Sequence, residues 1–168
     1  MNTVGEPVPI NVFSDHHCFG CGRLNIHGLH LMFYENVDGN GVWAPFTPTA
    51  AFEGYGGIVH GGIVCTILDE VMAWSLYREQ TWAVTGQLST RFRKPLVMGE
   101  PVVAIGKIVR DRGRVIDMRG EICRASDDVV LAEGTATFFR VPEAQAAEWN
   151  ERYQSGPVTL TARDEGEM

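Results

Sequence analysis

The sequence has no long apolar run, no secretory leader and few basic residues, and each absence excludes a class of protein. No apolar stretch approaches the ~20 residues that span a bilayer, so we expect no contact with a membrane. The N-terminal residues lack the basic start and apolar block of a signal peptide, which indicates a cytoplasmic protein. With 14 basic residues against 21 acidic ones, the net charge of −7 argues against binding to nucleic acid.

Cysteine is also scarce, at four residues in 168. Without a secretory leader, so few cysteines predict reduced thiols rather than a disulfide framework. A chain of this length fits one domain that buries roughly 70% of its unfolded surface. The hydrophobic content of 45% is typical of a soluble globular protein.

The hydrophobic pattern predicts one long helix among several strands. Alternation and turn residues predict strands over 28–36, 42–47, 82–96, 101–111, 115–125 and 129–141, a helix over 59–78 and a short helix over 143–153. We divide the chain into an N-terminal arm over 1–17, a domain over 18–141 and a partly mobile extension over 142–168. This order predicts an α+β fold in which an antiparallel sheet curls around one long buried helix.

The long helix carries two adjacent acids in apolar surroundings. From Ile63 to Leu76 apolar residues occupy nearly every side, and Asp69 and Glu70 are the only charges. An ionised carboxylate in an apolar interior costs several kcal/mol unless it is paired. Neighbours on a helix point about 100° apart, so both acids cannot face the same water. Either one acid is functional, or both lie on a solvated stripe of the helix.

The helix is preceded by His60-Gly61-Gly62, which is a candidate oxyanion hole. Helix N-termini leave backbone N–H groups unpaired, and each well-aimed donor contributes about 3–4 kcal/mol in a transition state. The alternative is that the glycines only permit close packing. Asp69 lies two and a half turns beyond His60, so the two groups cannot act on one atom within one chain. They either contact different parts of a substrate, or the acid comes from a second copy across a two-fold axis.

The strand after the helix has a polar face and a local basic cluster. Strict alternation predicts that Leu88 and its neighbours face one way while Thr85, Arg91 and Arg93 face the other. Arg91, Arg93 and Lys94 are candidates for holding the phosphate groups of a small ligand. The alternative is an ordinary solvated face.

"GIVHGGIVCTILDE", followed by "VTGQLSTRFRKPL", resembles the hotdog-fold thioesterases, particularly the phenylacetic-acid-degradation (PaaI) type. "CFGCGRLNIHGLHL" looks like the opening segment of one branch of that superfamily. The resemblance covers about residues 18–140. It implies a homodimer or a dimer of dimers, with active sites at the interface, acyl-CoA as substrate and no cofactor.

The resemblance also implies roles for individual residues. Asp69 matches the acid that acts as nucleophile or as general base for water, and Thr85 matches a hydroxyl that helps to hold the water. Gly61, next to His60, matches the glycine whose N–H polarises the thioester carbonyl. Gly62 and Glu70 are further candidates for substrate contact, and Glu70 is the alternative catalytic acid.

One position departs from the family pattern. Where some members have Asn or Gln six residues before the histidine, this sequence has Gly54. We therefore predict acyl-CoA thioester hydrolysis and keep two alternatives open. One is an acyl-CoA-binding protein without activity; the other is a hotdog hydratase or dehydratase.

A second motif has the residue types of a zinc site. Cys18-x-x-Cys21 is followed by His27-x-x-His30. Since His30 alternates with leucines in a strand-like pattern, we expect no bound metal.

Overall fold

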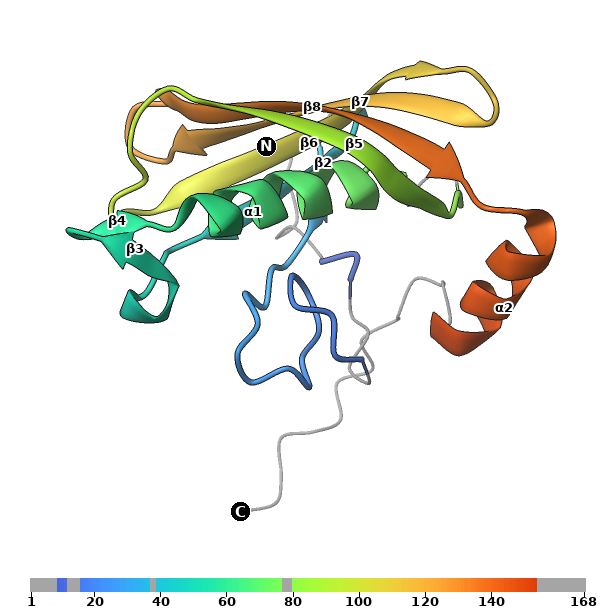
Figure 1. The fold of residues 1–168 in the computed structure, drawn as a ribbon, viewed down its shortest axis with the longest axis horizontal. Helices are drawn as coiled ribbons and strands as arrows, with labels where there is room; N and C mark the ends of the chain where they lie inside the picture. Colours follow the sequence, from blue (N-terminus) through green and yellow to red (C-terminus); the bar gives the residue numbers. More distant parts are fainter. Residues whose placement is uncertain (1–8, 12–15, 37–38, 77–79, 154–168) are drawn as a thin grey trace, which may run out of the picture.

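The computed structural model describes residues 9–11, 16–36, 39–76 and 80–153, and it consists of an antiparallel sheet that curves around a helix (Figure 1). The sheet has six strands in the order β1-β2-β6-β7-β8-β5, and β3 and β4 pair separately. The elements are β1 (Tyr34–Glu35), β2 (Val42–Phe46), η1 (Ala50–Phe52), β3 (Glu53–Tyr55), β4 (Ile58–Val59), α1 (Gly61–Trp74), β5 (Ala83–Phe92), β6 (Val102–Asp111), β7 (Val115–Arg124), β8 (Val130–Arg140) and α2 (Glu143–Tyr153). The predicted α+β architecture is confirmed.

Helix α1 is shorter than predicted at both ends. It begins after His60, whose side chain caps it, because Ile58–Val59 are extended and pair with β3. It ends at Trp74, and Ser75 is its C-cap. The predicted helical residues 77–79 lie outside the described part of the chain. Fully buried side chains recur at the three- and four-residue spacing of a face packed on a sheet, namely Val64, Ile67, Leu68, Val71 and Met72.

Three glycines let α1 approach the sheet closely. Gly106, Gly120 and Gly134 lie on β6, β7 and β8 and pair in one row across the three strands. A Cβ at Gly106 would lie 2.2 Å from the backbone oxygen of Val71 on the helix. A Cβ at Gly120 or Gly134 would meet Leu68 at 3.3 Å. The row is therefore a groove in the sheet in which the helix lies.

The segment before β1 covers the side of α1 that faces away from the sheet (Figure 1). The Phe33 ring stacks on Trp74 of the helix at 5.3 Å between centroids. Buried Asn11 holds this segment in place, because it donates to the Leu31 oxygen and accepts from the Phe33 N–H, both at 2.7 Å. Helix α1 is therefore enclosed between the sheet and this segment, which explains why apolar residues occupy nearly all its sides.

The predicted strand over 28–36 is mostly wrong. Only Tyr34–Glu35 form a strand. His30 adopts a left-handed backbone with φ 53°, which interrupts the extended conformation that pairing needs. Leu29 and Leu31 instead donate to the carbonyl oxygens of Phe19 and Gly20 in the preceding loop.

Strand β5 contains a bulge that the sequence pattern did not reveal. The register against β8 shifts between Thr85 and Gln87, so Gly86 is the extra residue. The bulge reverses the alternation, and Thr85 therefore shares the helix-facing side with Leu88 rather than lying opposite to it. A Cβ at Gly86 would lie 2.1 Å from the Phe139 ring, so the bulge also requires glycine.

The short helix predicted over 143–153 is confirmed as α2. It packs against the start of β5, where the Trp82 ring contacts Trp149 and Tyr153. Trp82 Nε1 also donates to Asn150 Oδ1 at 2.6 Å. Residues 154–168 and most of the predicted arm, namely 1–8 and 12–15, lie outside the described residues.

Candidate active site

Asp69 points toward β5 and is held there by Thr85. The Thr85 hydroxyl donates to Asp69 Oδ1 at 2.7 Å. Burial raises the pKa of Asp69, whereas this hydrogen bond lowers it, and negative charge on Cys18 raises it further. Asp69 is half-buried, so one carboxylate is oriented by a hydroxyl in partly dry surroundings.

Asp69 belongs to a stripe along α1 that faces β5. The stripe repeats every four residues, as Gly61, Cys65 and Asp69. Cys65 Sγ donates to Thr90 Oγ1 at 3.5 Å. A Cβ at Gly61 would lie 3.5 Å from the Phe92 ring, which places the helix N-terminus beside the far end of β5. The helix and this strand therefore run antiparallel, with Asp69 at one end and Gly61 at the other.

The His60-Gly61-Gly62 segment presents one unused backbone donor. His60 Nδ1 accepts from the Gly62 N–H at 3.0 Å, so this N–H is used in the helix cap that His60 forms and is not available to a ligand. No hydrogen-bond acceptor in the described part of the chain takes the Gly61 N–H. Both glycines are exposed. Of the two glycines predicted for the site, Gly61 is thus the one whose N–H is free to bind a substrate oxygen.

Gly61 and Asp69 are too far apart to meet on one atom. Eight residues of α-helix span about 12 Å along the axis. The structure of one chain therefore contains two half-sites, an N–H donor at one end of the α1–β5 seam and an oriented carboxylate at the other.

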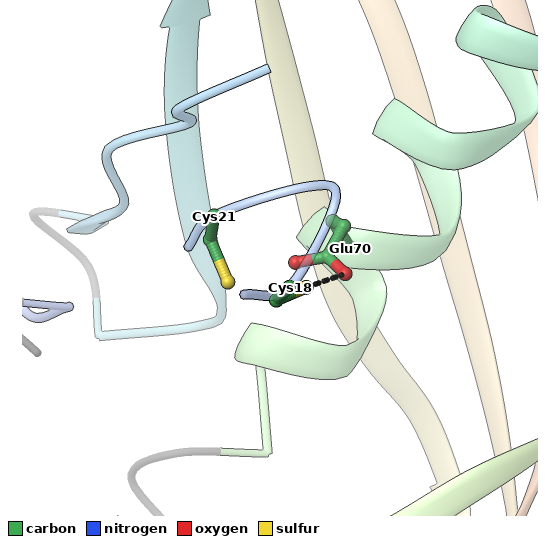
Figure 2. Close-up of side chains that lie close together, drawn as sticks. All are labelled: Cys18, Cys21 and Glu70. Atoms are coloured by element: carbon green, nitrogen blue, oxygen red, sulfur yellow. Dashed lines mark hydrogen bonds between the residues drawn. The ribbon is translucent and has the colours of Figure 1, made fainter. Parts of the chain in front are cut away.

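Glu70 has different surroundings from Asp69, as the helical offset between neighbours predicts. Figure 2 shows its carboxylate directed at Cys18 and Cys21 of the N-terminal segment. A hydrogen bond of 3.3 Å joins Cys18 Sγ to Glu70 Oε1. Burial raises the pKa of Glu70 to about 8, and negative charge on Cys18 acts in the same direction. Glu70 therefore lies away from the Asp69–Thr85 pair.

The two cysteines beside Glu70 differ sharply in acidity. The thiol of Cys21 and the backbone N–H groups of Cys21 and Gly20 hydrogen-bond to Cys18 and lower its pKa to about 5 against the opposing effect of burial. The same thiol contact, together with burial, raises the pKa of Cys21. No local pattern in the sequence connects these cysteines with Glu70, because 52 residues separate Cys18 from Glu70.

The predicted basic cluster lies at the Gly61 end of β5. Arg93 forms an ion pair with Glu133 at 2.5 Å, which offsets its charge. Arg91 and Lys94 are exposed, and no ion pair in the described residues involves them. Two of the three predicted cations are thus available at the surface near the helix N-terminus.

The two histidines of the predicted zinc motif do not join the cysteines. His30 Nε2 hydrogen-bonds to the Asn25 oxygen at 2.8 Å. Both His27 and His30 line a separate pocket of about 560 Å³ between the N-terminal segment and the β2–η1 region. Asp69 does not line that pocket either.

Gly54 lies directly against His60. A Cβ at position 54 would be 3.1 Å from His60 Cα, which is a tight contact. The residue that departs from the family pattern is therefore adjacent to the site in space. Here it contributes no side-chain hydrogen bond.

Comparisons of sequence point to one family. A family model described as the thioesterase superfamily matches residues 56–131. An uncharacterised protein of Schizosaccharomyces pombe is 31% identical over 114 residues, which cover 66% of this chain and 65% of that protein. The acyl-coenzyme A thioesterase THEM4 of Xenopus laevis is 25% identical over 112 residues, which cover 67% of this chain and 50% of that protein. The chain thus spans between half and about two thirds of the length of these curated relatives.

Solved structures share the fold. A crystal structure described as a thioesterase superfamily protein is 30% identical with a TM-score of 0.67, covering 73% of this chain and 62% of that one. A Streptococcus mutans protein solved with bound acetyl CoA is 21% identical with a TM-score of 0.60, covering 66% and 86%. At that identity the likeness concerns the fold alone. Within the described residues, no helix combines the length and apolar character needed to cross a membrane. The sequence matches and the shared architecture together show that this chain has the hotdog fold and is similar in sequence to the thioesterase superfamily.

Proposed function

We propose that the protein hydrolyses acyl-CoA thioesters at sites formed between two copies of the chain. The observation that carries the proposal is the oriented Asp69–Thr85 pair at one end of the α1–β5 seam, with the free Gly61 N–H at the other. The similarity to an acyl-coenzyme A thioesterase and to a structure holding acetyl CoA supports the substrate class.

The exposed edge of the sheet supports a two-fold partner. Strand β5 lies at the end of the strand order, so among the described residues no strand of the same chain pairs with its outer N–H and C=O groups. Near its two ends it exposes Val84 and Phe92, at 47% and 56%, and soluble proteins usually cover such an exposed strand edge. Pairing with β5 of a second copy satisfies the backbone groups and buries these side chains.

Two-fold pairing of β5 also brings the half-sites together. In an antiparallel pair centred between Thr85 and Phe92, the Thr85 end of one strand lies opposite the Phe92 end of the other. Because Asp69 lies beside Thr85 and Gly61 beside Phe92, each carboxylate then faces the helix N-terminus of the partner. Each dimer gains two complete sites in this arrangement.

The chemistry follows from these groups. The thioester carbonyl oxygen accepts a hydrogen bond from the Gly61 N–H, which stabilises the oxyanion as the carbonyl carbon is attacked. Asp69 either attacks that carbon to form an anhydride, which water then hydrolyses, or removes a proton from an attacking water. Both routes release CoA thiol and a free acid. Arg91 and Lys94, at the Gly61 end, are placed to bind the CoA phosphates.

The first test is Asp69→Asn, assayed on a panel of acyl-CoAs with a thiol-reactive dye. We expect turnover to be nearly abolished while circular dichroism and melting temperature stay normal. Asp128→Asn is the matched control, because Asp128 is exposed and its left-handed backbone, with φ 56°, suits asparagine. Normal turnover by Asp69→Asn would end the proposal. Binding of acyl-CoA without turnover by the unaltered protein would favour the inactive binding protein, and loss of enoyl-CoA absorbance would favour a hydratase.

The second test isolates the oxyanion donor. Gly61 is the first residue of α1, where proline is tolerated and removes only the N–H. His60 already has the extended backbone, φ −59° and ψ 134°, that a following proline requires. We expect Gly61→Pro to lower kcat by about 10²–10³-fold, whereas Gly61→Ala retains the N–H and most of the activity. Equal activity of the two variants would exclude Gly61 as the donor.

The third test asks whether the site is shared. Asp69→Asn and Gly61→Pro are each expected to be inactive alone. In a dimer that contains one chain of each kind, one of the two sites has both groups intact. Unfolding and refolding an equimolar mixture should therefore restore about a quarter of normal activity. No recovery, with mixed dimers verified by mass spectrometry, would contradict a shared site.

A further inference from the structure

Outside the proposed active site, two thiols and a carboxylate converge from distant parts of the chain. Cys18 Sγ, Cys21 Sγ and a Glu70 carboxylate oxygen all lie within 4.8 Å of one another (Figure 2). Cys21 is buried, and Cys18 and Glu70 are half-buried. These are ligand types that zinc and similar divalent ions prefer.

The spacing of the three groups suits a small tetrahedral ion. Zinc binds thiolate at about 2.3 Å and carboxylate oxygen at about 2.0–2.2 Å, so ligand atoms on one ion lie roughly 3.5–3.8 Å apart. Cys18 Sγ and Glu70 Oε1 are 3.3 Å apart. The other two distances are at most 4.8 Å, so shifts of up to about 1 Å would seat an ion among the three groups.

The loop that carries the cysteines is shaped to hold both thiols against the helix. The Gly22 N–H donates to the Cys18 oxygen at 2.9 Å and closes the turn. A Cβ at Gly20 would lie 2.3 Å from Glu70 Cδ, and one at Gly22 would lie 2.4 Å from the Cys18 nitrogen. Glycine at position 20 therefore lets the loop backbone pass close to the carboxylate, and glycine at position 22 lets the loop fold tightly on itself.

The cluster also contains three acidic groups and no cation. No ion pair within the described residues involves Glu70, and His27 and His30 line a different pocket. Three groups that become negative when they lose their protons repel one another. A divalent cation bound between them removes that repulsion.

We infer that Cys18, Cys21 and Glu70 form a binding site for a thiophilic divalent cation of the zinc class. The three protein ligands leave a fourth position for a water molecule or another small ligand. This ligand set differs from the two-cysteine, two-histidine motif in the sequence, because Glu70 takes the place of the histidines. The bound ion connects the N-terminal segment to α1 at the residue next to Asp69. The inference does not depend on the proposed hydrolysis.

The test uses the full reduced chain, produced without a polyhistidine tag and stripped of metal by a chelator. Titration with cobalt(II) should give thiolate-to-cobalt charge-transfer absorption that saturates at one ion per chain, and zinc(II) should displace it. Cys18→Ser and Glu70→Gln should each weaken binding at least tenfold. Cys123→Ser is the control, because Cys123 is a free thiol that lies outside the cluster, and this variant should bind normally. His27→Ala/His30→Ala should also bind normally.

A measurement on the unaltered protein tests the site even if the variants fail to fold. Zinc(II) should protect Cys18 and Cys21 from alkylation, as read by mass spectrometry of peptides, and should leave Cys65 as reactive as before. Absence of stoichiometric binding to folded, reduced protein would overturn the inference. Unchanged metal affinity in Glu70→Gln would show that Glu70 is not a ligand. Loss of metal binding only in His27→Ala/His30→Ala would likewise exclude Glu70 as a ligand.

Discussion

Replacing Gly106 with alanine tests whether the glycine row sets the distance between helix and sheet. The added Cβ would lie 2.2 Å from the oxygen of Val71, 2.5 Å from its carbonyl carbon and 2.9 Å from the nitrogen of Met72. All three atoms belong to the helix backbone, so no side-chain rotation relieves the clash. Either α1 or the centre of the sheet must shift.

The size of the effect follows from two opposing contributions. Overpacking a tight core costs roughly 1–3 kcal/mol, and a clash with backbone belongs at the upper end of that range. Alanine regains about 0.5–1 kcal/mol over glycine within a strand. We therefore expect Gly106→Ala to lower the free energy of unfolding by about 2 kcal/mol. For a chain of this size that corresponds to a melting temperature roughly 4–8 °C lower.

The control is the neighbouring glycine in the same row. At Gly120 the new Cβ would meet Met72 Cγ at 3.2 Å and Leu68 Cδ2 at 3.3 Å, and both are side-chain atoms that can move. Gly120→Ala should therefore remain within about 1 kcal/mol of the unaltered protein. Urea denaturation followed by circular dichroism measures both. If the two variants are equally stable, or if their order is reversed, the close approach of α1 at Gly106 does not determine stability.

Two further predictions concern single hydrogen-bonding groups. Thr85→Val removes the hydroxyl that holds Asp69. Because a hydrogen bond to a charged group contributes about 1.5–3 kcal/mol, kcat should fall roughly 10- to 100-fold, while Thr85→Ser should stay near normal. Similar kcat values for the two variants would contradict the orienting role of Thr85. Asn11→Ala should lower the free energy of unfolding by about 2–4 kcal/mol, because it leaves the buried Leu31 oxygen and Phe33 N–H unpaired, and a urea melt unchanged from that of the unaltered protein would show that Asn11 does not hold the segment.

The sequence predicted the elements better than the contacts between them. Hydrophobic periodicity placed α1 and the long strands, because burial imposes a period of 3.6 on a helix and of 2 on a strand. The glycine row was missed, although its signal is present: Gly106 and Gly120 are equidistant from the turn residue Gly113. Isolated glycines in strands mark a close approach of another backbone, and hairpin symmetry would have aligned these two.

The sequence predicted the candidate site only in part, because local patterns do not reveal contacts between elements. Thr85 was identified, but it was assigned to the wrong face, because strict alternation cannot detect a bulge; Gly86 was the available signal. The contact of Glu70 with Cys18 had no local signal, since it joins segments that only the folded chain brings together. The offset of about 100° between helical neighbours indicated that Glu70 and Asp69 face different ways, but it did not identify the partner of Glu70.

The adjacency of Asp69 and Glu70 has a consequence for trimming the chain. A shortened version that begins after Cys21 would uncover Glu70 and expose one flank of α1 to water. The helix would then lose the covering segment on the turn that carries Asp69, without any change to Asp69, Thr85 or Gly61. Loss of turnover after such a deletion would therefore report on support for the helix, and the amino-terminal segment should be counted as part of the folded unit that supports the proposed site.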